Sequence, residues 1–299
     1  MSCLIQASGL NKFFGSKQAL NNVEFEITKG APVALVGPNG AGKTTLFSIL
    51  CGYIQASSGQ VKVLGHEPGH SQTFGRLSAL PQDAQLDPRF SIAHQLSFYG
   101  QLQGLDKKQC RVEVERTLEL VGLSDVLKEK PDALSHGMRK RVAIAQALIG
   151  EPEIVMLDEA TAGLDPKHAR DIRELVASLS EQATFILSSH DLSELERLCQ
   201  QVLYLENGKL QQHQTLTNDK TVSYFTLRME TTSPGLIAAL SEIDGVSLVE
   251  NTQDREYLIT TRYQEGQEPL DIKILRMCHE KQWPYRQLIK GKTLENQLF

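Results

Sequence analysis

Residues 37–45 have the sequence Gly37-Pro38-Asn39-Gly40-Ala41-Gly42-Lys43-Thr44-Thr45. The preceding residues, 32–36, form an apolar, β-branched run that predicts a buried parallel strand. Residues 46–50 have the spacing of a helix with one buried face. Glycines between a strand and a helix let consecutive N–H groups form a nest for an anion, to which the helix adds its positive end. The stretch therefore predicts a phosphate-binding loop.

Two side chains suit this loop to a nucleoside triphosphate. Lys43 has the length to reach the β- and γ-phosphates, and the Thr44 hydroxyl is a suitable oxygen ligand for Mg²⁺. The alternative interpretation is an ordinary surface turn, which the flanking strand and helix disfavour. The loop by itself does not specify which reaction follows binding.

Composition places the chain among globular proteins. It has 299 residues, of which 40% are hydrophobic and 22% charged, enough for one large domain or two modest ones. No apolar run approaches the ~20 residues that span a membrane, and residues 1–6 lack the pattern of a signal peptide. Five scattered cysteines predict free thiols in a reducing cytoplasm. The net charge of −5 gives no basic field, so no nucleic-acid partner is expected.

Hydrophobic periodicity predicts a sheet interrupted by helices. Residues 91–122 have helical spacing, and Asp106 with Gln109 has the pattern of a capping box at the second helix start. The expected strands are 3–7, 23–27, 61–64, 154–157 and 184–187, followed by a hairpin at 202–210. The strands 3–7, 23–27 and 61–64 suggest that part of the sheet is antiparallel. The polar stretch Gln211–Lys220 predicts a linker.

The last part of the chain has a different pattern. Its order of elements is β-α-β-β-α-β, which predicts a small ferredoxin-like α+β domain. The expected strands are 222–229, 246–250, 256–261 and 285–288, and the expected helices are 234–243, with Pro234 at its start, and 269–281. No group of residues in this part has a catalytic pattern.

A pair of carboxylates, Asp158 and Glu159, directly follows the apolar run 154–157. Ligands of parallel α/β sheets bind beyond the carboxyl ends of the strands. Asp158 can hold Mg²⁺, directly or through water, and Glu159 can orient and polarise an attacking water. The alternative is a pair of solvated loop acids, which the phosphate-binding loop disfavours.

A third motif is Leu134-Ser135-His136-Gly137-Met138, followed by Arg139-Lys140-Arg141 and an apolar helix through Ile149. Ser135 is a suitable N-cap, and Gly137 allows backbone to approach an anion closely. Three cations at a helix start oppose the helix dipole, and a bound phosphate would offset that clash. A capped surface helix with extended basic side chains is the alternative.

Together and in this order, these segments resemble the nucleotide-binding subunit of an ATP-binding cassette (ABC) transporter over about residues 3–215. The resemblance implies an α/β fold with a P-loop NTPase (RecA-like) core, an antiparallel β subdomain and a helical subdomain. The expected domains are a nucleotide-binding domain at 1–215, with its helical subdomain at about 88–150, and the small accessory domain at 221–299.

The strongest matches to the family are three motifs. Residues 37–45 resemble its phosphate loop, Asp158-Glu159 its second Walker motif, and Leu134 to Met138 its signature Leu-Ser-Gly-Gly-Gln. The resemblance implies that Ser135 and Gly137 face a phosphate. It also implies ATP as the nucleotide and Mg²⁺ as the cofactor.

Four further positions match individually weaker features. Gln82, after Leu80-Pro81, is similar to the glutamine that senses Mg²⁺ and water, and Asp165 lies in a segment that resembles the loop crossing the dimer interface. His190 matches the switch histidine that contacts the γ-phosphate, and Phe14 lies where an aromatic ring stacks on adenine. Taken singly, Gln82 is also consistent with a surface residue, His190 with a cap at the end of a strand, and Phe14 with a core residue.

The sequence departs from the family pattern at a few positions. In the signature, His136 replaces the first glycine and Met138 the glutamine. Ala160 and Ala162 stand where Pro and Ser are common, and Phe14 replaces a tyrosine. The positions expected to face phosphate are retained, so an active site is expected.

The resemblance also implies partners. Two such domains associate head to tail, so a second copy or a sister subunit is expected, and ATP binding and hydrolysis drive transmembrane permease subunits. The expected location is cytoplasmic, at the inner face of the cytoplasmic membrane, with the helical region and the segment after Gln82 receiving the permease. The small accessory domain and the ending, residues 292–299, resemble multidrug- and polysaccharide-type exporters.

Three alternatives remain open at this stage. One is a soluble cassette ATPase that acts on DNA, ribosomes or assembly, although no second cassette, coiled-coil insertion or basic linker is visible. Another is an importer ATPase with a regulatory C-terminal domain. A phosphotransferase with the same loop is the third, and it gives no reason for the signature segment.

Overall fold

The computed structural model describes residues 2–190, 195, 198–199, 201–214, 222–262 and 269–290. The chain divides into two compact units, Met1–Gln214 and Thr215–Phe299. The ending at 292–299, on which the resemblance to exporters partly rests, lies outside the described residues.

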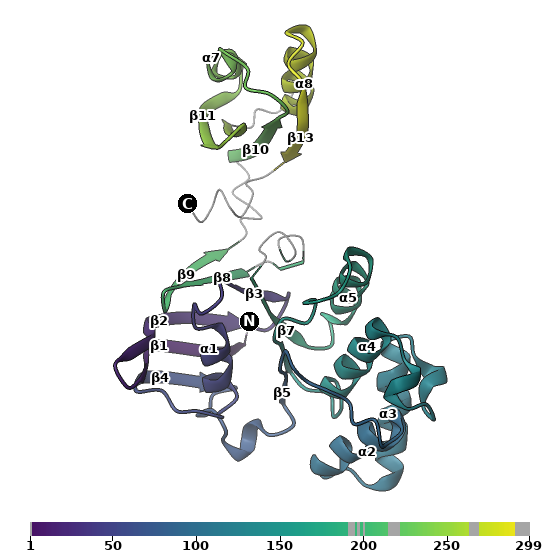
Figure 1. The fold of residues 1–299 in the computed structure, drawn as a ribbon. Coiled ribbons are helices and arrows are strands. Elements are labelled where there is room, and N and C mark those ends of the chain that lie inside the picture. The colour runs from purple at the N-terminus through teal and green to yellow at the C-terminus, as the bar shows by residue number, and fades with distance from the viewer. Residues whose placement is uncertain are drawn as a thin grey trace. The chain divides into compact units, whose positions relative to one another are not determined.

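An antiparallel sheet opens the first unit, with strand order β2-β1-β4 (Figure 1). Its strands are β1 (Cys3–Phe14), β2 (Lys17–Thr28) and β4 (Ser58–Val63). The first two are longer than predicted because their register shifts at several points, including between Ala7 and Leu10. Such irregularities break the alternation of apolar and polar residues that the prediction used, while pairing continues. The longer β1 carries Phe14 at its end.

The second sheet of this unit contains the predicted parallel strands and has the order β5-β6-β7-β3-β8-β9. Its first five strands pair in parallel, and β9 pairs antiparallel with β8 as the predicted hairpin. The strands are β3 (Val33–Val36), β5 (Leu77–Leu80), β6 (Ile154–Leu157), β7 (Thr184–Ser189), β8 (Gln201–Glu206) and β9 (Lys209–Gln214). The linker prediction was wrong for residues 211–214, which continue β9; residues 215–220 lie outside the described part.

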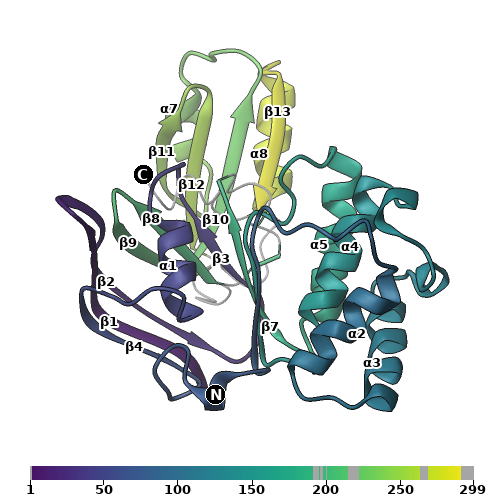
Figure 2. The same ribbon diagram turned by 60° about the horizontal axis from the view of Figure 1, so that its bottom comes forward.

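Helices flank this sheet, and three of them lie within the helical subdomain expected at about 88–150. The helices are α1 (Lys43–Leu50), α2 (Ile92–Leu102), α3 (Lys107–Leu120), α4 (His136–Ala147) and α5 (Pro166–Leu179). The capping box is confirmed, since the Asp106 carboxylate accepts from Gln109 N and the Gln109 side chain accepts from Asp106 N, each at 2.8 Å. Figures 1 and 2 show α2, α3 and α4 grouped beside the sheet, with α5 next to α4. No helix among the described residues is long and apolar enough to cross a membrane.

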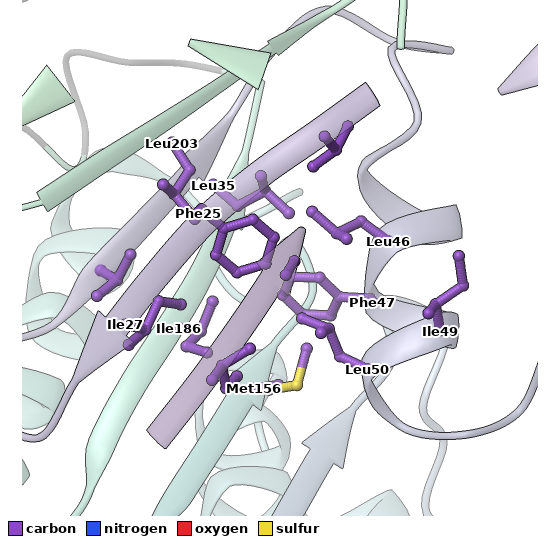
Figure 3. Close-up of a cluster of buried hydrophobic side chains, with 14 of the residues drawn as sticks. Phe25, Ile27, Leu35, Leu46, Phe47, Ile49, Leu50, Met156, Ile186 and Leu203 are labelled. Carbon is purple, nitrogen blue, oxygen red and sulfur yellow. The ribbon is translucent and has the colours of Figure 1, made fainter. Parts of the chain in front are cut away.

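A hydrophobic core joins the two sheets of the first unit around α1 (Figure 3). Phe25 and Ile27 enter it from β2, and Leu46 and Phe47 from α1, while strands β3, β6, β7 and β8 of the parallel sheet add further residues. These include Leu35, Met156, Ile186 and Leu203. Burial of a large apolar side chain is worth about 1.5–3 kcal/mol, so this core fixes α1, and the loop before it, against both sheets.

The second unit has the predicted β-α-β-β-α-β order, and its antiparallel sheet has the strand order β11-β12-β10-β13. Its elements are β10 (Val222–Met229), α7 (Leu236–Ser241), β11 (Val246–Gln253), β12 (Glu256–Arg262), α8 (Leu270–Glu280) and β13 (Tyr285–Lys290). The prediction that a helix begins at Pro234 was wrong. Gly235 has a φ of +81°, a left-handed conformation that places the helix start after it.

Candidate active site

The predicted phosphate loop connects β3 to α1, in the centre of the parallel sheet. A Cβ added to Gly37 would lie 2.0 Å from the backbone oxygen of Leu205, and one added to Gly42 would lie 2.6 Å from that of Ala19. Gly42 also has a φ of +112°. Only glycine fits these two positions, because backbone atoms cannot move aside as a side chain can. The turn before α1 is therefore fixed by close backbone approach.

Lys43 is buried and directed into this loop. Its Nζ donates to the backbone oxygen of Gly37 at 2.7 Å, and it lies 3.8 Å from Oε1 of Glu159. The side chain is only 7% exposed, so its charge acts in a medium of low dielectric constant. An ammonium held there is suited to the phosphate groups of a nucleotide.

The carboxyl ends of four neighbouring parallel strands converge beside the loop. Beyond β3 lies the loop itself, and Leu80 of β5 pairs with Leu157 of β6, after which Gln82 and Asp158 follow. Between β3 and β6 runs β7, which ends at Ser189. Parallel pairing thus delivers segments far apart in the sequence to one edge of the sheet, as the pattern of apolar runs predicted.

Asp158 is the centre of a buried hydrogen-bond network. It is 7% exposed, and its Oδ1 accepts a short hydrogen bond from the Ser188 hydroxyl. Its Oδ2 accepts from the Thr44 hydroxyl at 3.4 Å. A hydroxyl and a carboxylate side by side are oxygen ligands of the kind that Mg²⁺ uses while it retains several waters. The residues present therefore fit a Mg²⁺ ion.

Glu159 follows in a strained conformation. Its φ is +50°, which a residue with a side chain rarely adopts, and its backbone N–H donates to the Ser188 hydroxyl at 2.9 Å. The side chain, 9% exposed, contacts His190 Nδ1 through Oε2 at 2.8 Å. Strain of this kind costs about 1–3 kcal/mol and persists where the surroundings over-determine it, often at active sites. The carboxylate is thereby aimed at the cleft.

These groups line one cleft of about 280 Å³. It brings together ten of the predicted site residues: Phe14, Asn39, Gly40, Gly42, Lys43, Thr44, Thr45, Gln82, Asp158 and Glu159. Gly37 and His190 adjoin it through the contacts of Lys43 and Glu159. Pro38 and Ala41 belong to the same loop, where Ala41 N donates to Pro38 O at 3.1 Å. Lys17 and Ala19 from β2 also line the cleft.

Phe14 forms an exposed rim of the cleft. The residue is 50% exposed, which excludes the interpretation that it is simply part of the core. The Lys12 ammonium lies 5.0 Å from the ring centroid, within the range of a cation–π contact. An exposed ring beside a phosphate site is available for stacking with a planar base.

The predicted signature segment begins α4, away from the residues that line this cleft. Ser135 is its N-cap, as predicted, and its hydroxyl accepts from Met138 N at 3.2 Å. Gly137 is buried, and a Cβ there would lie 2.9 Å from Cδ2 of the His168 ring. We call residues 135–137 the signature turn. Its serine is exposed, whereas its glycine packs against α5.

Asp165 links α5 to this turn. Its carboxylate is the N-cap of α5 and contacts His168 Nδ1 at 2.5 Å. The hydrogen bond with His168 lowers the pKa of the Asp165 carboxyl below its ordinary value. Asp165 therefore stays ionised and positions the ring that covers Gly137. Neither Ser135, Gly137 nor Asp165 is among the residues that line the phosphate-loop cleft.

Comparison with known proteins identifies the family of this fold and site. A sequence profile described as ABC transporter matches residues 20–162. The linearmycin resistance ATP-binding protein LnrL of Bacillus subtilis (strain 168) is 33% identical over 210 residues, covering 69% of this chain and 68% of that protein. The chain belongs to the ATP-binding cassette transporter family. It is an ATP-binding subunit of an ABC transporter, and its chemical activity is ATP hydrolysis.

Other ABC proteins similar to this one differ in the direction of transport that their names state. The Nod factor export ATP-binding protein I of Bradyrhizobium diazoefficiens is 35% identical over 209 residues, 68% of each chain. The spermidine/putrescine import ATP-binding protein PotA of Bacteroides fragilis is 34% identical over 214 residues, 70% of this chain and 46% of that one. Among solved structures, cbiO1 of Clostridium perfringens, part of the transporter complex cbiONQ, is 28% identical. It has a TM-score of 0.66 and covers 72% of this chain and 89% of its own. The predicted cassette fold is confirmed.

Sequence reasoning missed Ser188 as a site residue of this ABC ATPase. Its hydroxyl donates to Asp158 and accepts from Glu159 N, so one side chain orients both acids. The available signal was its position at the end of the apolar run that begins at Thr184, directly before Ser189 and His190.

Cys51, at the end of α1, does not compete with water as a nucleophile in this site. Burial, helped by the Asp158 charge, raises the pKa of its thiol to about 12.

Proposed function

We propose that this ABC ATPase subunit hydrolyses ATP at a site completed by a second nucleotide-binding subunit, and so powers export through transmembrane permease subunits. One observation carries the proposal. The cleft contains a buried cation, a carboxylate pair and the phosphate loop, while the exposed signature serine lies outside it. A second copy or a sister subunit supplies the missing side.

Within the cleft, the residues have separate roles. Residues 37–45 cradle the phosphates with backbone N–H groups, and Lys43 contacts the β- and γ-phosphates. Thr44 and Asp158 hold Mg²⁺, which neutralises charge on the phosphates when it is bound, and Gln82 contacts the same ion and the water. The Phe14 ring stacks on adenine.

The hydrolytic step is assigned to Glu159. Its carboxylate accepts a proton from the attacking water, whose oxygen bonds to the γ-phosphorus as the bond to the β–γ bridging oxygen breaks. His190, at 2.8 Å, orients that carboxylate and contacts the γ-phosphate. The Ser188 hydroxyl keeps Asp158 and Glu159 in fixed positions relative to each other.

The signature turn acts on the nucleotide of the other subunit. Ser135 and the start of α4 offer a hydroxyl, backbone N–H groups and the positive end of a helix, all suited to an anion. Asp165 lies in the loop between the two sites. In this arrangement ATP closes the dimer and hydrolysis reopens it, which drives the membrane subunits at the inner face of the cytoplasmic membrane.

Export is proposed over import because the small accessory domain at 221–299 resembles that of multidrug- and polysaccharide-type exporters. The matched stretch is alike for relatives of both directions, 209 residues at 35% identity for the Nod factor export protein and 214 residues at 34% identity for the polyamine import protein. The second candidate is therefore an importer ATPase in which residues 221–299 have a regulatory role. The helical region at 88–150 and the segment after Gln82 receive the permease in either case.

The test uses a catalytically slowed parent, Glu159→Gln, whose ATP-bound dimer accumulates. Ser135→Arg in this parent is expected to abolish the ATP-dependent dimer in size-exclusion chromatography with light scattering, because the long cation blocks the partner's phosphate. Binding of ATP to the monomer is retained. Ser124→Arg makes the same exchange at an exposed site in the helical region and should leave the dimer intact. A dimer that survives Ser135→Arg with unchanged stability argues against the shared site.

A further inference from the structure

A cleft of about 340 Å³ in the second unit has no role in the cassette chemistry. It lies where β10 ends and β12 begins, and β13 closes its other side. Its lining consists of Arg228, Met229, Asp254, Arg255, Glu256 and Arg286. We call it the arginine cleft. Its volume falls within the range of small-molecule sites, about 300–1,000 Å³.

Both carboxylates of the arginine cleft are already engaged by arginines. Glu256 is buried, accepts a short hydrogen bond from Arg228 Nε, and accepts a second from the Thr252 hydroxyl at 3.3 Å. Asp254 lies 3.3 Å from Arg255 Nε. The three guanidiniums outnumber the two acids, so the cleft has a net positive charge in a chain whose total is −5.

Arg255 is held in place by backbone on both sides. It belongs to the two-residue turn between β11 and β12 and has a φ of +60°, which a non-glycine residue rarely adopts. Its carbonyl oxygen accepts from Met229 N at 2.8 Å, and its Nη1 donates to Glu230 O at 2.8 Å. These contacts leave further N–H groups of the guanidinium to face the cleft.

Arg286 reaches the same cleft through an irregularity of β13. Arg228 pairs with Gln287, whereas the next residue, Met229, pairs with Tyr285. Arg286 is therefore the extra residue of a β-bulge, a feature that re-aims side chains and is common beside binding sites. The guanidinium of Arg286 forms no ion pair or hydrogen bond with any residue that the structure describes.

We propose that the arginine cleft binds a small oxyanion, a carboxylate or phosphate group, to which the guanidiniums of Arg286 and Arg255 both donate hydrogen bonds. Guanidinium groups match both anions with paired N–H donors, and fixed positions lower the entropic cost of binding. The bulge, the strained turn and the ion pair of Arg228 with the buried Glu256 lie at the cleft and pre-form it. This site is independent of the ATP site and gives residues 221–299 a ligand-binding role.

The test is isothermal titration calorimetry on the full chain carrying Lys43→Ala, so that the phosphate loop does not compete for the probe. Inorganic phosphate and citrate are titrated separately at constant ionic strength. Saturable binding of at least one probe is expected, and the stronger probe assigns the site to phosphate or carboxylate. Absence of saturable binding for both probes overturns the proposal.

Variants in the same background locate the binding. Arg286→Ala should weaken it at least about tenfold, and Arg286→Lys should weaken it less, because the charge remains while the planar fork is lost. Lys290→Ala removes one positive charge from the same strand outside the cleft and should leave affinity unchanged. Equal affinity in Arg286→Ala and the parent, or equal weakening by Lys290→Ala, contradicts the assignment. If Arg286→Ala lowers the melting temperature, the affinity for the probe is compared between Arg286→Lys and Lys290→Ala instead. Weaker binding by Arg286→Lys alone then supports the assignment, and equal affinity in the two variants contradicts it.

Discussion

The phosphate loop and the signature turn are both glycine-containing segments at the start of a helix, yet they are built in opposite ways. In the loop, Gly37 and Gly42 meet backbone atoms of other strands, and Lys43 is buried behind them. In the signature turn, the three atoms nearest to a Cβ at Gly137 all belong to the ring of His168, and Ser135 is exposed.

For the proposed shared site, the difference indicates which half one chain forms by itself. Backbone atoms fix the geometry of the loop, so it is ready for phosphates before any partner arrives. A side chain on α5 supports the turn, and that side chain is tied to Asp165. A segment supported this way can adjust by small rotations, which suits the contact with a second subunit that we propose for it.

The largest expected effect tests the chemistry of the loop side. Glu159→Gln retains the size and the contact with Ser188 through the backbone, but an amide cannot accept the proton of water. We expect the turnover number for ATP to fall by at least about 10²-fold. Nucleotide affinity, measured by equilibrium binding, should stay within about twofold. Asp132→Asn, an exposed acid-to-amide exchange in the helical region, is the control and should hydrolyse ATP normally. Turnover in Glu159→Gln close to wild type would remove Glu159 from the proposed role.

The second prediction compares two glycines of the loop. Gly37→Ala places a Cβ 2.0 Å from Leu205 O, so strand β8 must move, and we expect a destabilisation of about 3 kcal/mol or more with loss of ATP binding. Gly40→Ala meets no atom within 4 Å and suffers only from its φ of +81°, a cost of about 1–2 kcal/mol. Denaturant unfolding measures both. Equal destabilisation would show that conformational strain, not contact with β8, restricts this loop.

The third prediction tests the softer support of the signature turn. Gly137→Ala brings a Cβ within 2.9 Å of a ring that can rotate, so we expect a destabilisation of only about 1 kcal/mol. ATP binding to the monomer should be unchanged, while ATP-dependent dimerisation weakens. The double variant Gly137→Ala, His168→Ala removes the ring and should recover part of the lost stability, a coupling that a double-mutant cycle quantifies. Purely additive effects would mean that the two residues do not support each other.

The sequence predicted the loop side better than the rest, for a physical reason. Glycines before a buried lysine, and acids after an apolar strand, leave a pattern because local backbone geometry requires them. Ser188 left almost none, since its role depends on β7 lying between β3 and β6, a neighbourhood set by long-range pairing. The contact of His168 with Gly137 was likewise invisible, because it joins two helices whose packing no local spacing encodes. The helix start at Leu236, after Gly235, was missed because Pro234 favoured an earlier one.

The smallest expected effect concerns the exposed rim of the cleft. Phe13 and Phe14 are adjacent aromatic residues with similar exposure, 45% and 50%, but only Phe14 lines the cleft. Stacking of a ring on a base is worth about 0.5–1.5 kcal/mol, so Phe14→Ala should raise KM for ATP by about 2- to 10-fold and leave kcat nearly unchanged. Phe14→Tyr keeps the ring and should stay within about twofold of wild type. Phe13→Ala removes the same group outside the cleft, so a change in KM equal to that of Phe14→Ala would mean that the end of β1, and not base stacking, is responsible. If KM responds only to Phe14, the rim contributes binding alone, and the rate of hydrolysis is set by the buried groups behind the loop.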